Sequence, residues 1–118
     1  MVIEDDSCAA EIFHQMLTGA GYDVVVVGSA EAGLMETSRL SPAAVVLDLH
    51  LPAGTGLEYL RQLRAMPDRG EVPVAIVTGD YLLDENTARE LTALGARIHF
   101  KPVWEEDLLR IVAALVPP

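Results

Sequence analysis

The feature that most constrains the fold is a regular alternation of short apolar runs with segments of helical periodicity along the chain. The apolar runs are continuous rather than alternating, which is typical of strands buried on both faces of a parallel sheet. We therefore predict five strands, and they cover residues 1–3, 24–27, 43–47, 74–77 and 97–100.

The segments between these strands carry apolar residues at helical spacing. They predict helices over residues 9–17, 30–40, 57–64, 85–94 and 104–116. Ser29 and Asp84 stand where helix N-caps belong, and Pro42 and Gly95 stand where helices end. We expect the core face of the first helix to carry Ile12, Phe13, Met16 and Leu17, and that of the second to carry Ala32, Leu34, Met35 and Leu40.

Five strands that alternate with five helices favour a single α/β domain with a doubly wound parallel sheet. The length of 118 residues fits one domain, which we place at residues 1–116. Pro117 and Pro118 resemble the start of a linker, and they favour a domain excised from a larger protein. Right-handed crossovers would bring the carboxyl ends of all strands to one edge, where such folds place their sites.

Polar residues follow the predicted strands at this edge of the sheet. They are Glu4 and Asp5 after the first strand, Asp48 after the third, Thr78 after the fourth and Lys101 after the fifth. An acid in such a place is most often a helix cap, a role that suits Asp6 equally well. Together, the carboxylates predict a site for a hard cation such as Mg²⁺. Zinc is disfavoured because no cluster of cysteine and histidine occurs at ligand spacing.

The same residues resemble the motifs of the response-regulator receiver (CheY-like) family of two-component signalling, essentially from end to end. The resemblance rests on Glu4-Asp5, on Asp48-Leu49-His50-Leu51-Pro52 with Gly56, on Thr78-Gly79 and on Lys101-Pro102. The intervals between these motifs also resemble those of the family. The implied fold is flavodoxin-like, with strand order 2-1-3-4-5.

By this resemblance, Asp48 is the phosphoacceptor, which takes a phosphoryl group from the phosphohistidine of a sensor kinase or a phosphotransfer protein. The implied ligands of Mg²⁺ are Glu4, Asp5, Asp48 and the backbone carbonyl of His50. Thr78 and Lys101 resemble the hydroxyl and the cation that bind the phosphoryl group.

The resemblance also gives roles to the loops. Pro52 and Gly56 belong to the loop after the acceptor, Gly79 leaves space for a phosphoryl group, and Pro102 stands where the family has a cis peptide. The side chain of His50 lies where it can affect the access of water to a phosphoaspartate.

Two features depart from the family pattern. Ile98 replaces the aromatic residue that reorients when the threonine moves toward phosphate, and the first strand is short, so its stability is in question. A degenerate receiver that signals as a phosphate-independent interaction module is therefore the alternative hypothesis. In either case, we expect the output face, and any homodimer, to use the fourth helix, the fifth strand and the fifth helix, with Glu90, Arg97 and Arg110.

The charge and composition of the chain argue against several other classes of protein. The net charge of −10 and the lack of a basic stripe argue against binding to nucleic acid. No apolar run approaches the length of a membrane span, and one cysteine, Cys8, is compatible with a reducing compartment, so we expect a cytoplasmic protein. A phosphatase of the haloacid dehalogenase type would need an acid where His50 stands. We expect a signalling domain rather than an enzyme, one that assists its own phosphoryl transfer and dephosphorylation.

Overall fold

The computed structural model describes residues 1–51 and 55–116 of the chain. Five strands form one parallel sheet, and they are β1 (Val2–Ile3), β2 (Val26–Val27), β3 (Val45–Leu47), β4 (Val74–Thr78) and β5 (Arg97–Phe100). The five helices are α1 (Ser7–Gly19), α2 (Ala30–Leu40), α3 (Gly56–Ala65), α4 (Glu85–Ala93) and α5 (Glu105–Leu115). The predicted alternation of strand and helix is confirmed.

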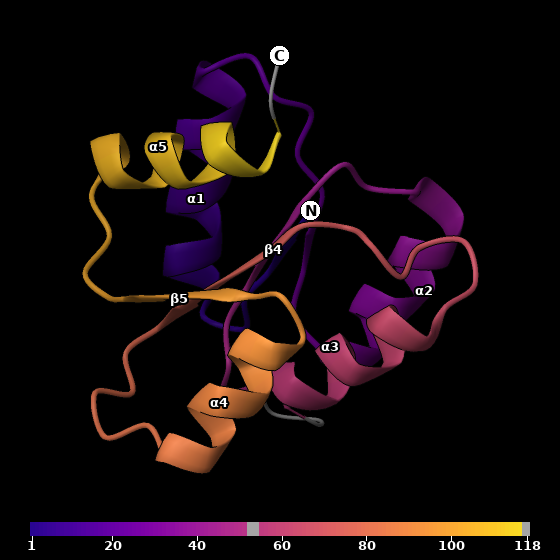
Figure 1. Ribbon diagram of the computed structural model, residues 1–118. Helices are drawn as coiled ribbons and strands as arrows, with labels where there is room; N and C mark the ends of the chain where they lie inside the picture. Colours follow the sequence, from indigo (N-terminus) through magenta and orange to yellow (C-terminus); the bar gives the residue numbers. More distant parts are fainter. Residues whose placement is uncertain (52–54, 117–118) are drawn as a thin grey trace.

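The strands are ordered β2-β1-β3-β4-β5, as the resemblance implied. Figure 1 shows α1 and α5 together on one side of the sheet and α2, α3 and α4 on the other. This doubly wound arrangement directs the carboxyl ends of all five strands to one edge. The polar residues that follow the strands therefore lie at one edge of the molecule.

Several short polar residues fix where the helices begin. Ser29 Oγ accepts a hydrogen bond from the N–H of Ala32, and Asp84 accepts one from Asn86, so both predicted N-caps are confirmed. Asp6 caps α1 by accepting from the N–H groups of Cys8 and Ala9. Such caps satisfy amide groups that have no partner inside the helix.

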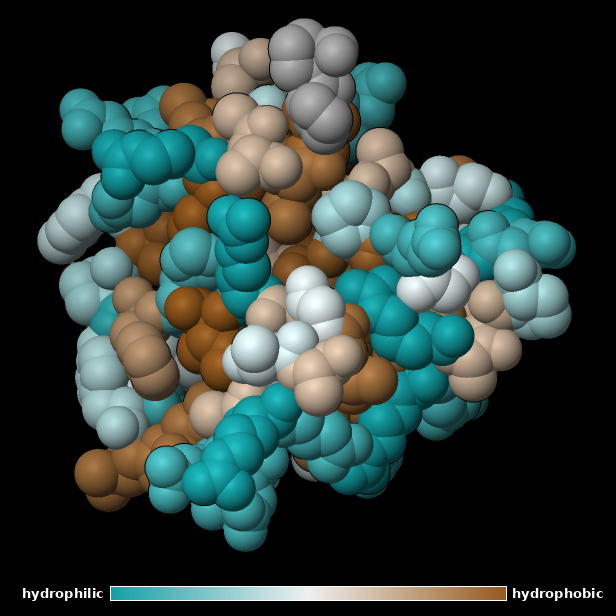
Figure 2. Space-filling model, in the orientation of Figure 1, coloured by the Kyte–Doolittle hydropathy of each residue, from teal (hydrophilic) through white to brown (hydrophobic). Residues whose placement is uncertain are grey.

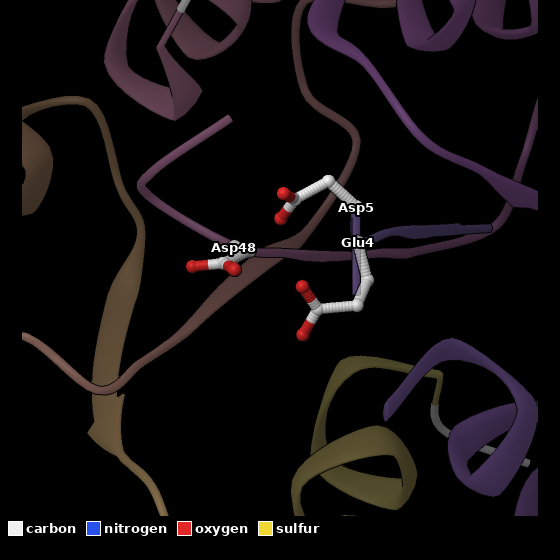
Figure 3. Close-up of side chains that lie close together, drawn as sticks. All are labelled: Glu4, Asp5 and Asp48. Atoms are coloured by element: carbon white, nitrogen blue, oxygen red, sulfur yellow. The ribbon is translucent and has the colours of Figure 1, made fainter. Parts of the chain in front are cut away.

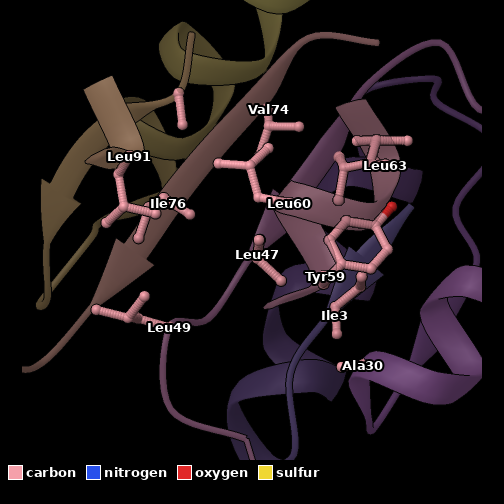
Figure 4. Close-up of a cluster of buried hydrophobic side chains, with 12 residues drawn as sticks. Ile3, Ala30, Leu47, Leu49, Tyr59, Leu60, Leu63, Val74, Ile76 and Leu91 are labelled. Atoms are coloured by element: carbon pink, nitrogen blue, oxygen red, sulfur yellow. The ribbon is translucent and has the colours of Figure 1, made fainter. Parts of the chain in front are cut away.

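Two apolar clusters hold the sheet between its helix layers. The larger, shown in Figure 4, packs side chains of β1, β3 and β4 against α2, α3 and α4. Its one hydroxyl group belongs to Tyr59, which is fully buried and lies 2.7 Å from Thr37 Oγ1. The second cluster packs Val2 and Val46 against Phe13 of α1 and Leu108 of α5. β1 is thus packed on both faces, which holds the residues that follow it.

Three details of the sequence prediction are wrong. β2 pairs only at Val26–Val27, because the strand beside it, β1, is itself two residues long. Ile12 is 48% exposed and Met35 is 67% exposed. The core face of α1 includes Phe13 and Leu17, as expected, whereas that of α2 is made by Gly33 and Thr37. Small residues bring α2 close to the sheet, and apolarity alone does not reveal this.

No helix in residues 1–51 or 55–116 combines the length and apolar character that crossing a bilayer requires.

Candidate functional site

The acids of the candidate site are positioned by the two central strands. Glu4 and Asp5 follow β1, and Asp48 follows β3. These strands are parallel neighbours, and the N–H of Asp48 donates to the carbonyl of Ile3 over 2.9 Å. This ladder bond fixes Asp48 beside the residue that precedes Glu4.

Three carboxyl groups converge at this place. One carboxylate oxygen each of Glu4, Asp5 and Asp48 lies within 4.8 Å of the others. Figure 3 shows the three groups directed into one space. Glu4 is buried, Asp48 is half-buried and Asp5 is exposed. The donor set consists of oxygen atoms alone and opens to solvent at Asp5, so it fits a hard divalent cation that keeps some of its water.

Lys101 brings a positive charge to the same cluster from the end of β5. Its Nζ donates to Glu4 Oε1 over 2.6 Å and lies 3.6 Å from Asp48 Oδ2. Burial lowers the pKa of Lys101, but the hydrogen bond to Glu4 and the charges of Asp48 and Glu4 outweigh it, so the pKa lies above its usual value. Lys101 is the only lysine of the chain, and it stays charged at neutral pH.

Glu4 is the buried member of the acid cluster. Its side chain is 1% exposed. Burial, followed by the hydrogen bond and negative charge of Asp48, raises the pKa of Glu4, and Lys101 only partly offsets this. Like charges without a sufficient counter-charge favour the protonated form. A cation bound among the three acids would offset the repulsion between their negative charges.

Thr78 and His50 are joined through a residue that sequence reasoning missed. Thr78 is fully buried at the end of β4, and its Oγ1 accepts from the N–H of Asp80 over 3.2 Å. Asp80 Oδ2 lies 2.8 Å from His50 Nε2, and this pair lowers the pKa of Asp80. The N–H of His50 approaches Asp48 Oδ1 at 3.3 Å. A chain of contacts therefore links Asp48 with Thr78 across two loops.

The remaining loop residues frame the site. The peptide bond between Lys101 and Pro102 is cis. Gly79 has open space where a Cβ would be. Pro52 lies outside the described residues. Gly56 packs against the backbone that follows β3, since a Cβ there would approach Asp48 O at 2.7 Å and Leu49 Cα at 3.0 Å.

Gly56→Ala is therefore expected to destabilise the domain by about 1–3 kcal/mol, as overpacking of a tight site does. The obstructing atoms belong to the backbone and cannot rotate away. Urea unfolding measures the change. Gly19→Ala is the matched control, because nothing lies within 4 Å of its Cβ position and α1 gains a better helix former. Equal stability of the two variants would contradict the packing at Gly56.

β5 carries Ile98 and a half-buried histidine, His99. Ile98 is half-buried and pairs with Ile76 of β4. The exposed rings of Tyr81 and Phe100 stack with centroids 5.8 Å apart. An aromatic contact between the β4–α4 loop and β5 thus exists, although not at position 98. Burial, and then the charge of Arg97, lowers the pKa of His99.

The His99 shift predicts how stability depends on pH. The unfolded chain binds this proton more tightly than the folded domain, so the contribution of His99 is complete above pH 6.5 and is lost as the pH falls toward the folded pKa. Urea unfolding from pH 7.5 to 5 should show a steeper loss of stability for the wild type than for His99→Gln. Parallel curves would contradict the burial of this ring.

Comparison with known proteins gives a family match. The model of the family described as "Response regulator receiver domain" matches residues 1–113. The DNA-binding response regulator MtrA of Mycobacterium tuberculosis is 38% identical over 78 residues, which are 66% of this chain and 33% of MtrA. The sensory/regulatory protein RpfC of Xanthomonas campestris pv. campestris is 32% identical over 118 residues, covering 98% of this chain and 16% of RpfC. The chain thus spans a third or less of these curated relatives.

A solved structure supports the fold independently. The receiver domain of sensor histidine kinase PA1611 from Pseudomonas aeruginosa, with magnesium coordinated in its active site cleft, superimposes with a TM-score of 0.87. It is 23% identical, and the alignment covers 99% of this chain and 95% of that domain.

Proposed function

Because this chain belongs to the response regulator receiver domain family, we propose that it accepts a phosphoryl group from phosphohistidine onto Asp48. The observation that carries the proposal is the cluster of Glu4, Asp5 and Asp48, whose carboxylate oxygens lie within 4.8 Å, with Lys101 beside it. An exposed rim at Asp5 leaves the cluster open to a donor. The alternative hypothesis is a phosphate-independent interaction module. It does not explain why three carboxyl groups and an ammonium group are gathered at one edge of the sheet.

The reaction exchanges one bond to phosphorus for another. A carboxylate oxygen of Asp48 attacks the phosphorus atom, the O–P bond forms, and the P–N bond to the imidazole of the donor breaks. The freed imidazole nitrogen keeps the electron pair of the broken bond. Such a transfer depends on in-line positioning and on neutralising the charge of three phosphoryl oxygens. Asp48 is fixed for this by its ladder bond to Ile3.

Lys101 and Thr78 are the side chains proposed to bind the transferred group. The ammonium of Lys101 lies 3.6 Å from Asp48 Oδ2 and is held there by Glu4. The hydroxyl of Thr78 has a hydrogen to donate, because it accepts rather than donates in its contact with Asp80. Prearranged donors of this kind stabilise charge without reorganisation during the reaction.

Glu4, Asp5, Asp48 and the backbone carbonyl of His50 are the groups that would hold Mg²⁺. When bound, Mg²⁺ supplies positive charge for the acids and for the phosphoryl oxygens. The fit rests on the all-oxygen donor set, which opens to solvent at the exposed Asp5.

We propose a sensor histidine kinase or a histidine phosphotransfer protein as the donor, and we assign the domain to signalling rather than to catalytic turnover. RpfC is described as a sensory/regulatory protein and MtrA as a DNA-binding response regulator, so receivers of this kind occur within larger regulators. A cytoplasmic site of action accords with the single, exposed Cys8.

Incubation with Mg²⁺ and acetyl phosphate tests the function. We expect the intact mass to increase by one phosphoryl group, and the increase to require Mg²⁺. Circular dichroism establishes that the sample is folded. A folded domain without any gain in mass would favour the phosphate-independent module instead.

The proposed output face comprises α4, β5 and α5. A groove of about 550 Å³ runs between β5 and α5, lined by Phe100 and Ile111 and edged by Arg97 and Arg110. Figure 2 shows apolar surface exposed between these two elements. Glu90, also expected on this face, is paired with Arg61 of α3, so it is less available to a partner than the sequence suggested.

Signal transmission to this face has a testable consequence. Beryllofluoride with Mg²⁺ should shift the backbone NMR resonances of β5 and α5, and Thr78→Ala should reduce these shifts at least about threefold, because the hydroxyl no longer draws the β4–α4 loop toward the acceptor. Ser38→Ala is a matched control, since it removes an exposed hydroxyl from α2. Undiminished shifts in Thr78→Ala would contradict the role of Thr78.

A further inference from the structure

The outer side of β5 is an open edge of the sheet. β5 pairs with β4 alone, in parallel. Figure 1 shows it as the outermost strand, with α4 on one side of the sheet, α5 on the other and no described element along its outer edge. The other edge strand, β2, has only two residues. Because an exposed edge strand is a template for pairing with another chain, β5 is the place where this sheet offers one.

The outward backbone groups of β5 belong to Ile98 and Phe100. The N–H of Lys101 donates to the last carbonyl of β4 over 2.8 Å. Backbone groups alternate sides along a strand, so those of His99 also point toward β4, and those of Ile98 and Phe100 point away from it. In the described part of the chain, nothing pairs with these outward groups. The edge thus presents two N–H donors and two carbonyl acceptors at strand spacing.

A groove lies beside this edge because α5 is placed over the other strands. Leu108 and Val112, the buried residues of α5, pack with side chains of β1, β3 and β4, and no residue of β5 belongs to this cluster. The face of β5 that carries His99 therefore borders the groove of about 550 Å³, whose opposite wall includes Ile111 and Leu115 of α5. Figure 2 shows apolar surface at this place. The groove has room for side chains from one face of an added strand.

Arg97, at the start of β5, is the one arginine or lysine of the described residues that has neither an ion pair nor a hydrogen bond. Five of the others form ion pairs with carboxylates, and Arg64 and Arg69 donate to backbone carbonyls. An exposed arginine without a counter-charge stands out in a chain of net charge −10. Arg110 edges the same groove, and Asp107 is the one acid among the lining residues. The edge of the groove is thus positively charged in an acidic protein, which favours an acidic partner.

We propose that the outer edge of β5 binds an extended segment of a partner protein as a sixth strand of the sheet, with an acidic side chain of this segment beside Arg97. Hydrogen bonds to the backbone of Ile98 and Phe100 hold the segment, and alternate side chains of the segment enter the groove. The proposal rests on the output face proposed above, of which β5 and α5 are part. It does not rest on phosphorylation of Asp48.

Strand alternation sets the side chains that the segment requires. The residue opposite Arg97 lies beside an unpaired cation, so an acid fits there. The residue opposite His99 points into the groove toward Ile111, so it is apolar. The residue opposite Phe100 lies on the other face, beside an exposed aromatic ring, where a β-branched or aromatic side chain packs well. The expected pattern is an acid followed by apolar residues on both faces.

The probe is the synthetic peptide threonine–glutamate–valine–leucine–valine–glutamate–threonine, acetylated and amidated at its ends. Its sequence reads the same in both directions, so it fits either strand orientation. Backbone NMR of the domain, without Mg²⁺ or a phosphodonor, follows the binding. At saturation we expect amide hydrogen exchange to slow at least about fivefold at Ile98 and Phe100. Exchange at His99 should change by less than about twofold, because its N–H already points toward β4.

Two controls separate the backbone from the charge. The same peptide with N-methylated valine, leucine and valine keeps its side chains but loses the backbone donors, so it should bind at least about tenfold more weakly. Arg97→Gln should weaken the binding of the unmodified peptide about threefold. Arg89→Gln is the matched variant, since it removes an exposed charge from α4, and it should leave the binding unchanged.

Absence of saturable shifts in β5 up to about 5 mM peptide would overturn the proposal. Equal binding of the N-methylated peptide would contradict strand addition and would indicate a partner, such as a helix, that docks through side chains alone. Protection of Ile98 and Phe100 that grows with the concentration of the domain, without peptide, would assign the edge to a second copy of the chain. Unaltered binding by Arg97→Gln would contradict the acidic requirement. Phosphorylation of Asp48 is measured separately by intact mass, so its failure leaves each of these results standing.

Discussion

Asp48→Asn is expected to gain no phosphoryl group at this site from acetyl phosphate and Mg²⁺, under conditions in which the wild type is phosphorylated. The amide has the shape of the carboxylate but no anionic oxygen to attack phosphorus. The fold should persist, because the ladder bond to Ile3 uses the backbone N–H. Intact mass spectrometry measures the loss.

The same variant should not be destabilised in the absence of Mg²⁺. Asp48 raises the pKa of Glu4 through a hydrogen bond and its charge, so its neutral replacement relieves repulsion inside the cluster. Asp84→Asn is the control, since asparagine also caps α4 and lies outside the acid cluster. Phosphate incorporation by Asp48→Asn equal to that of the control would show that Asp48 is not the acceptor.

Lys101→Met is expected to reduce the rate of phosphorylation by about 100-fold or more, as the loss of one charge-stabilising donor commonly does. Nothing else among the described residues brings a cation this close to Asp48. The rate of mass gain at fixed acetyl phosphate and Mg²⁺ measures the effect. Arg97→Met removes a positive charge from β5, the strand that precedes Lys101, outside the cluster, and should phosphorylate normally.

Lys101→Met should also lower the free energy of unfolding by about 1–3 kcal/mol at neutral pH, because it leaves the buried Glu4 without its closest counter-charge. Mg²⁺ should restore part of this loss, since a bound cation would replace the missing charge. A variant that keeps both the wild-type rate and the wild-type stability would contradict the proposed role of Lys101.

The sequence predicts where these polar residues gather because two simple signals agree. Apolar β-branched runs mark the strands, and a polar residue follows β1, β3 and β5, so Glu4, Asp48 and Lys101 were expected at one edge. The topology then brings Glu4 and Lys101 within 2.6 Å, although they stand at opposite ends of the chain. The positions of the strands in the sequence predict this proximity, because the carboxyl ends of parallel strands lie at the same edge of a sheet.

Other features could not be read from one sequence. Asp80 contacts His50 only because two loops meet, and loop conformation has no periodic signal. Ile12 and Met35 are apolar but exposed, because the core faces of α1 and α2 are set by how closely each helix approaches the sheet. The Tyr81–Phe100 stack likewise depends on the path of the β4–α4 loop.

A crystal structure with Mg²⁺ and beryllofluoride would locate the phosphoryl position and the cation in one experiment. We expect beryllofluoride on a carboxylate oxygen of Asp48, within hydrogen-bond distance of Thr78 and Lys101. We also expect one Mg²⁺ at Glu4, Asp5, Asp48 and the carbonyl of His50. Beryllofluoride bound away from Asp48, or Mg²⁺ bound without any of these acids, would contradict the proposed function.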